Sequence, residues 1–150
     1  MSRTLNSTIG ILCALALAAC GGGDSPADPG GNGGDNGGSD RVIKADPSFS
    51  ADIQEIFARK GCTASGCHGS AQEGGLDLRA SAAYAQLVNV AALGEDRIRV
   101  IPGDAQNSYL VIKLEGRQSF GSQMPLGGSE LDNIDLTNVK NWINQGAKQN

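Results

Sequence analysis

The 150-residue sequence contains a single histidine, His68, and only 4% aromatic residues. One histidine excludes a His-rich metal site and leaves His68 as the sole imidazole for any Ser-His-Asp or Cys-His hydrolase. The 12 basic residues are outnumbered by 16 acidic ones, so the basic stripe of a nucleic-acid-binding protein is lacking, and we expect no nucleic-acid partner. The longest apolar run, residues 9–19, is about half the ~20 residues that a membrane-spanning helix needs.

That apolar run follows a short polar start carrying Arg3 and ends in Leu17-Ala18-Ala19-Cys20. A basic start followed by a short apolar core is typical of an export signal. The segment resembles the lipobox of bacterial lipoproteins, in which the peptide is cut before the cysteine and the cysteine receives the lipid. The resemblance implies a signal peptide over residues 1–19 and lipidation of Cys20. The alternative is an ordinary secretory signal in which Cys20 is incidental.

Residues 21–40 contain nine glycines, four aspartates and no large apolar side chain. Such a segment cannot bury enough surface to offset its ordering entropy, so we expect it to be disordered. We assign residues 20–45 to the lipidated cysteine with a disordered Gly-rich linker, and residues 46–150 to one folded domain. A Gly-rich chain of twenty residues spans roughly 25 Å on average, which suits a tether that holds a domain off a membrane.

Residues 46–150 show mainly helical periodicity, and the predicted fold class is all-α with about 3–5 short helices. The first helix is indicated by charges that complement its dipole, and Gly61 is expected to end it. Asp132 is the expected N-cap of the last helix. A brief strand is expected over residues 97–101, ended by Pro102. Four helices are expected. The first has an apolar face made of Phe49, Ile53, Ile56 and Phe57, and the others cover residues 81–88, 108–115 and 133–145.

The first predicted helix leads directly into Cys62-Thr63-Ala64-Ser65-Gly66-Cys67-His68. A c-type haem needs two thiols that form thioethers with its vinyl groups and an adjacent imidazole that binds the iron. The segment therefore resembles the haem-binding motif of the class I cytochrome c family. The closest resemblance is to small exported bacterial domains with a final Trp-containing helix, as in residues 136–147. The family's usual spacing is C-x-x-C-H, whereas four residues separate the cysteines here, and Ser65-Gly66 could bulge outward to accommodate them.

The resemblance also implies a second axial ligand. Class I cytochromes c carry a distal methionine in a loop before the last helix, often followed by proline. Met1 is removed with the signal, which leaves Met124 in Gly121-Ser122-Gln123-Met124-Pro125. The implied cofactor is one covalently bound haem c, attached to Cys62 and Cys67, with His68 as proximal and Met124 as distal axial ligand.

The function implied is that of a monohaem electron carrier rather than an enzyme, working between redox partner proteins of the cell envelope. The domain would be lipid-anchored through Cys20 and face the periplasm. Because Gly21 is not the aspartate associated with inner-membrane retention, the outer membrane is favoured over the inner one.

Three other interpretations of the cysteines stay open. Cys62 and Cys67 could form a disulfide that staples a lipoprotein domain with a structural or partner-binding role. A zinc site would be one ligand short, and a redox-active disulfide more typically has two residues between its cysteines. A haem peroxidase is a further possibility, and it requires that Met124 does not bind the iron.

Overall fold

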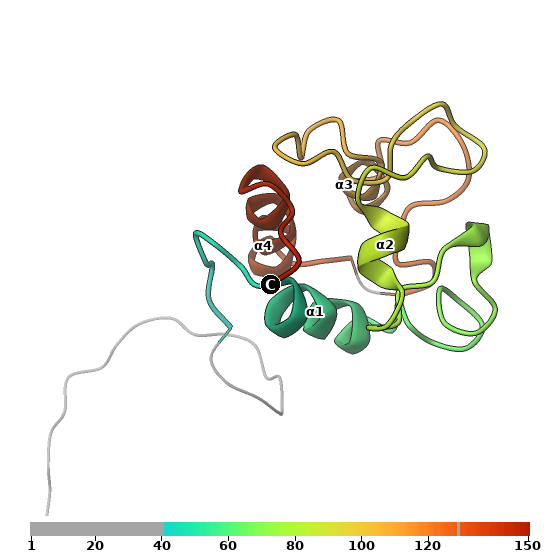
Figure 1. Ribbon diagram of the computed structural model, residues 1–150. Helices are drawn as coiled ribbons and strands as arrows, with labels where there is room; N and C mark the ends of the chain where they lie inside the picture. The colour runs from blue at the N-terminus through green and yellow to red at the C-terminus, as the bar shows by residue number, and fades with distance from the viewer. Residues whose placement is uncertain (1–40, 129) are drawn as a thin grey trace, which may run out of the picture. The chain divides into compact units, whose positions relative to one another are not determined.

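The computed structural model describes residues 41–128 and 130–150. The signal peptide predicted over residues 1–19, the lipidation of Cys20 and the linker up to residue 40 lie outside the described residues. The described part is helical, as expected for an all-α fold, and Figure 1 shows its four α-helices joined by long loops.

The first helical segment begins at Ser48, whose hydroxyl accepts a hydrogen bond from the amide of Ala51. A wide first turn, η1 (Phe49–Ile53), continues directly into α1 (Gln54–Arg59). The apolar face predicted for this helix is confirmed, because its four members are all buried: Phe49, Ile53, Ile56 and Phe57.

Gly61 ends α1 in a left-handed conformation, with a φ of +72°. The Gly61 amide donates to the carbonyl of Ala58, and the Cys62 amide donates to that of Phe57 at 2.9 Å. These two bonds form a Schellman motif, which satisfies the last carbonyls of the helix. The motif fixes the direction in which the chain leaves α1, and it places Cys62 immediately after the helix.

Three later helices match the predicted ranges or are shorter than them: α2 (Ala83–Leu87), α3 (Tyr109–Leu114) and α4 (Asn133–Asn144). The short helical turn η2 (Glu73–Gly75) was not predicted. Asp132 caps α4 as predicted, since its carboxylate accepts from the Asp135 amide at 3.0 Å. The prediction of a strand over residues 97–101 is wrong. The backbone there pairs partly with residues 88–92 and partly with the start of α3, so only isolated bridges form in the described chain.

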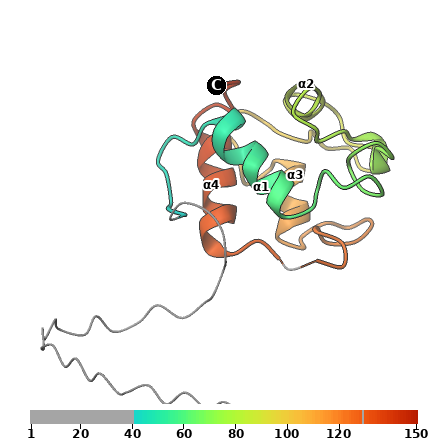
Figure 2. The ribbon, with the colours of Figure 1, turned by 90° about the horizontal axis from the view of Figure 1, so that it is seen from below.

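The core lies where α4 packs on η1 and on α3, three elements that lie side by side in Figure 2. Trp142 of α4 is 1% exposed, and its ring centroid lies 5.1 Å from that of Phe49. On its other side Phe49 meets Tyr84 of α2 edge to face, with centroids 5.3 Å apart. Aromatic pairs in these geometries favour a single packed arrangement. Phe49 thus packs η1 against both α2 and α4.

Residues 41–45, which the sequence analysis assigns to the linker, contact α4. The Asn138 side chain accepts from the Lys44 amide at 2.8 Å and donates to the carbonyl of Val42 at 2.9 Å. Asn141 donates to the carbonyl of Lys44 at 2.7 Å. We call residues 41–45 the arm. Its backbone is hydrogen-bonded by side chains of α4, so the folded part of the chain includes the arm.

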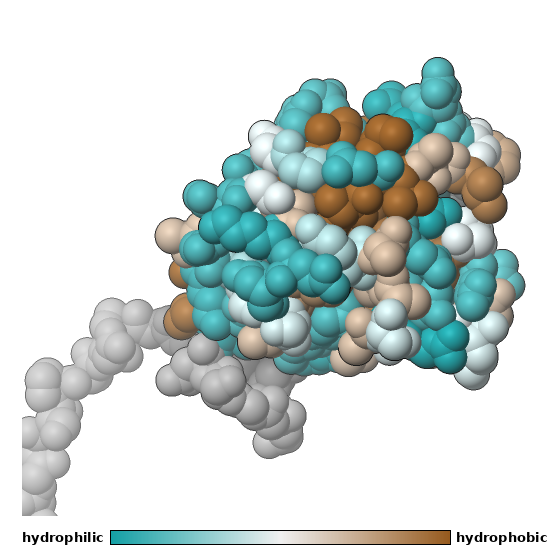
Figure 3. All heavy atoms as spheres, in the orientation of Figure 1, coloured by the Kyte–Doolittle hydropathy of each residue, from teal (hydrophilic) through white to brown (hydrophobic). Residues whose placement is uncertain are grey.

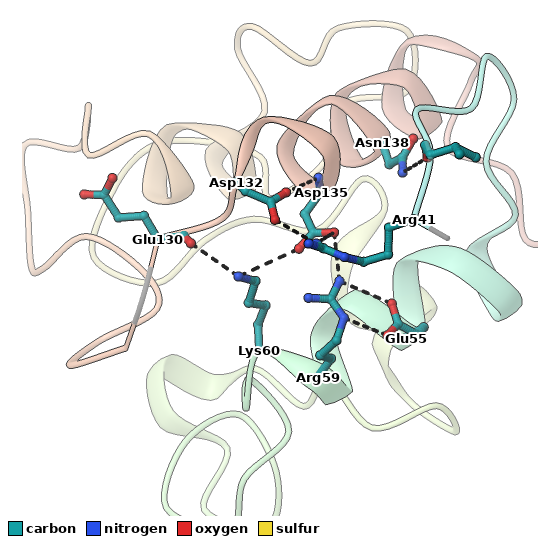
Figure 4. A network of polar contacts seen from close by, with 9 residues as sticks. Arg41, Glu55, Arg59, Lys60, Glu130, Asp132, Asp135 and Asn138 are labelled. Atoms are coloured by element: carbon teal, nitrogen blue, oxygen red, sulfur yellow. Dashed lines mark hydrogen bonds and ion pairs between the residues drawn. The ribbon is translucent and has the colours of Figure 1, made fainter. Parts of the chain in front are cut away.

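A buried carboxylate, Asp135 of α4, organises the contact between the arm, α1 and α4. One oxygen accepts from Arg59 at 2.8 Å and from Arg41 at 3.1 Å. Lys60 Nζ lies 3.9 Å from the other oxygen and 3.4 Å from the carbonyl of Glu130. Figure 4 shows these side chains converging on Asp135. A buried carboxylate needs such partners, because charge is costly to remove from water.

Candidate functional site

A cavity of about 610 Å³ lies beside the core. Its wall is built by the end of α1, by the loop that carries the cysteines, by α3 and by residues 120–128. This volume falls within the usual range for small-molecule and cofactor sites, roughly 300–1,000 Å³. Most of the lining is apolar.

The cavity brings together all four predicted cofactor residues. Cys62, Cys67, His68 and Met124 all line it, although Met124 comes from a loop near the other end of the chain. The two cysteines are free thiols in this structure. Cys62 is half-buried against the core, and burial raises the pKa of its thiol to about 11. Cys67 is exposed.

The His68 ring is held by the backbone of its own loop. Its Nδ1 lies 2.8 Å from the carbonyl oxygen of Glu73. A carbonyl can only accept, so this contact requires the proton on Nδ1 and leaves the lone pair on Nε2 for a metal. The His68 amide also donates to the Cys62 carbonyl at 3.0 Å, and the Leu78 amide donates to the His68 carbonyl at 2.7 Å. Both the ring and the backbone of His68 are therefore fixed.

Met124 is held by α3. Its amide donates to the carbonyl of Lys113 at 2.9 Å, and the neighbouring Gln123 side chain donates to the carbonyl of Leu114 at 3.1 Å. Both carbonyls lie in the last turn of α3, where helical partners are missing. The loop that carries Met124 thus completes the end of α3, and the half-buried thioether packs against the core at the cavity.

Arg99 is a site residue that the sequence did not reveal. It is 7% exposed and lines the cavity. Its guanidinium donates to the carbonyls of Gln86 at 2.9 Å, Gly75 at 3.0 Å and Gly74 at 3.3 Å, and burial lowers its pKa. No carboxylate of the described residues forms a salt bridge with it. The cavity therefore holds a buried positive charge that would favour an anionic ligand.

Three large apolar side chains at the cavity are open to solvent. Leu93, Phe120 and Leu126 are 65%, 63% and 70% exposed, and all three belong to its lining. Figure 3 shows a group of hydrophobic residues on the face of the molecule that is turned to the viewer, with hydrophilic residues around it. Exposed apolar groups that converge on a cavity are typical of a wall that an apolar ligand covers.

Comparison of the chain with models of protein families, with curated proteins and with solved structures finds no match. Across residues 41–128 and 130–150, none of the helices has both the length and the apolar character needed to cross a bilayer.

Proposed function

We propose that this chain is a c-type cytochrome that carries single electrons in the cell envelope. The observation that supports the proposal most is the convergence of Cys62, Cys67, His68 and Met124 on one apolar cavity. Two thiols, an imidazole and a thioether are the donor set of a covalently attached haem with both axial positions filled. The sequence motif and the Met124 loop are independent segments, and each contributes its expected donors.

The residues present fit this cofactor in three respects. Cys62 and Cys67 would attach it, each thiol adding sulfur to one carbon of a vinyl double bond and hydrogen to the other, so no oxidant is consumed. His68 would bind the iron through Nε2, because its Nδ1 is engaged by Glu73. Arg99 would face the propionate carboxylates, since it is a buried cation at the cavity without a carboxylate partner among the described residues.

When bound, the haem supplies an iron that changes oxidation state by one electron. His68 and Met124 would both bind the iron, and a metal held in this way from two sides of the cavity would take no substrate as a ligand. The apolar wall would exclude water from the metal. Both features favour an electron carrier over an enzyme such as a peroxidase.

The proposed location follows from the segment that precedes the described residues. Cleavage before Cys20 and lipidation of its thiol would anchor the chain to a membrane, and the Gly-rich linker would act as a tether. Confinement near the membrane raises the effective concentration of the domain for redox partner proteins there. The outer membrane is favoured over the inner one because residue 21 is glycine.

The test uses the full chain, exported by a host that has c-type haem maturation machinery. We expect haem to stay attached on a denaturing gel and the reduced protein to show a sharp α band. The matched control carries Cys62→Ala with Cys67→Ala, and it should carry no covalent haem. A colourless folded chain whose Cys62 and Cys67 form a disulfide would overturn the proposal in favour of a structural lipoprotein.

A further inference from the structure

The four residues between the cysteines form a hydrogen-bonded turn, not a loose bulge. The carbonyl of Ala64 accepts from the amides of Cys67 at 2.9 Å and Gly69 at 3.1 Å. The carbonyl of Ser65 accepts from the amide of Ala71 at 3.0 Å. The spacer is thus bonded to the chain on both sides of His68, although its own side chains are mostly exposed.

At Gly69, directly after His68, the chain passes closest to the backbone of the spacer. It is buried, and its φ is not positive. A Cβ at this position would lie 2.3 Å from the carbonyl oxygen of Thr63 and 2.7 Å from that of Ala64. Both atoms are backbone, so a side chain could be accommodated only by moving the spacer. Gly69 is therefore needed for space and not for conformation.

The same turn holds the three haem-binding residues in place. The His68 amide donates to the Cys62 carbonyl at 3.0 Å, and the Glu73 amide donates to the Cys67 carbonyl at 3.0 Å. Glu73 in turn fixes the His68 ring through its own carbonyl. A spacer shortened to two residues by removal of Ala64 and Ser65 would leave the amides of Gly69 and Ala71 without these acceptors. Gly69 is buried, so the loss of the acceptor for its amide is costly, whereas Ala71 is exposed and its amide can bond to water.

We infer that the four-residue spacer and Gly69 form one unit that directs both thiols and the His68 imidazole into the cavity. Gly69 is a positioning residue, and the long spacing is a requirement of this chain. The inference rests on the proposed function. It predicts that restoring the common C-x-x-C-H spacing impairs haem attachment.

The experiment compares Gly69→Ala with Gly103→Ala in the full exported chain. Gly103 does not line the cavity, and a Cβ there would meet no atom within 4 Å, although its φ of +83° strains an alanine. Mass spectrometry of the haem-bearing peptides measures the ratio of chains with two thioethers to chains with one. We expect this ratio to fall about tenfold in Gly69→Ala, because a forced backbone shift misaligns one thiol, and to be unchanged in Gly103→Ala. Deletion of Ala64 and Ser65 should lower it as well.

General loss of stability is controlled by Val139→Ala, which removes buried volume from α4. That variant should lower the yield of protein without changing the thioether ratio. Two outcomes would overturn this inference alone, provided that the wild type carries covalent haem. One is an unchanged ratio in Gly69→Ala, and the other is a deletion variant that carries as much haem as the wild type. A wild-type chain without covalent haem would overturn both this inference and the proposed function.

Discussion

Arg59 of α1 donates a hydrogen bond of 2.8 Å to Asp135 of α4, whose side chain is almost fully buried. That bond is the main reason why the pKa of Arg59 is raised above its usual value. The same oxygen of Asp135 accepts from Arg41 in the arm. A single carboxylate therefore holds together the helix that leads into the cysteines, the last helix and the N-terminal end of the domain.

We expect Asp135→Ala to lower the free energy of unfolding by about 3 kcal/mol, because Arg59 and Arg41 lose their buried partner. Chemical denaturation of the chain measures the change. The control is Glu55→Ala, which removes the other partner of Arg59. Glu55 is exposed and pairs four residues along the same helix, so its removal should cost about 0.5 kcal/mol or less. Equal losses in the two variants would contradict the special role of Asp135.

Met124→Ala should retain covalent haem and lose the weak near-red absorption band of iron–sulfur coordination. The reduction potential should fall, since a methionine ligand raises it. Leu126→Ala is the matched control, because it removes a cavity-wall side chain from the same loop but no sulfur, so the near-red band should remain. A near-red band that survives Met124→Ala would remove Met124 from the iron.

Arg99→Leu should lower both stability and reduction potential. The carbonyls of Gln86, Gly74 and Gly75 lose their donor, which should cost about 2 kcal/mol of unfolding free energy. If the cavity holds the proposed haem, loss of a positive charge there should favour the oxidised, more positive iron and so lower the potential. Voltammetry and denaturation measure the two effects. Arg97→Leu is the control, since that side chain is more exposed and pairs with Glu95; a potential equal in both variants would contradict the placement of Arg99.

Thermal stability should decrease as the pH falls below about 4.5. A hydrogen bond from Arg79 holds the pKa of Asp77 below its usual range. Burial raises the pKa of Asp132, but the Asp135 amide and Arg41 outweigh it and bring the pKa below the ordinary value. A carboxyl with a lowered folded-state pKa stabilises the fold when ionised, so its contribution is present at neutral pH and lost on protonation.

Melting temperatures recorded at steps from pH 7 to pH 3 check this prediction. Asp77→Asn should weaken the dependence on pH, because the substituted residue no longer titrates. A melting temperature that stays constant down to pH 3 would show that these ion pairs contribute nothing to the acid response.

The α-helices could be predicted from the sequence, because the apolar residues of each recur with helical spacing. The face from Phe49 to Phe57 is buried as expected, and Asp132 caps α4. The assignment of Cys62, Cys67, His68 and Met124 to a cofactor stays a prediction; the structure places all four at one cavity. Their convergence on one cavity depends on tertiary packing, which periodicity does not specify.

Other features left no such mark in the sequence. Arg99 lies in an alternating segment, where a charged residue is expected to face solvent. Its guanidinium is nevertheless buried and donates to the backbone carbonyls of Gln86 in α2 and of Gly74 and Gly75 in η2. By its sequence Asn138 is an ordinary polar residue in a helix. Its side chain, however, accepts from the Lys44 amide and donates to the Val42 carbonyl of the arm. Hydrogen bonds between a side chain and a remote backbone follow no repeat, so pattern analysis misses them.

The attachment of the arm to α4 has a mechanical consequence. Tension applied to the chain from its N-terminal side would first reach Arg41, Val42 and Lys44. The hydrogen bonds of these residues to α4 and its N-cap would resist the force together; their partners are Asp132, Asp135, Asn138 and Asn141. Force would thus pass into α4, the longest helix, before it reaches the turn that holds Cys62 and His68. The hydrogen bonds between the arm and α4 would therefore bear the load before the cavity does.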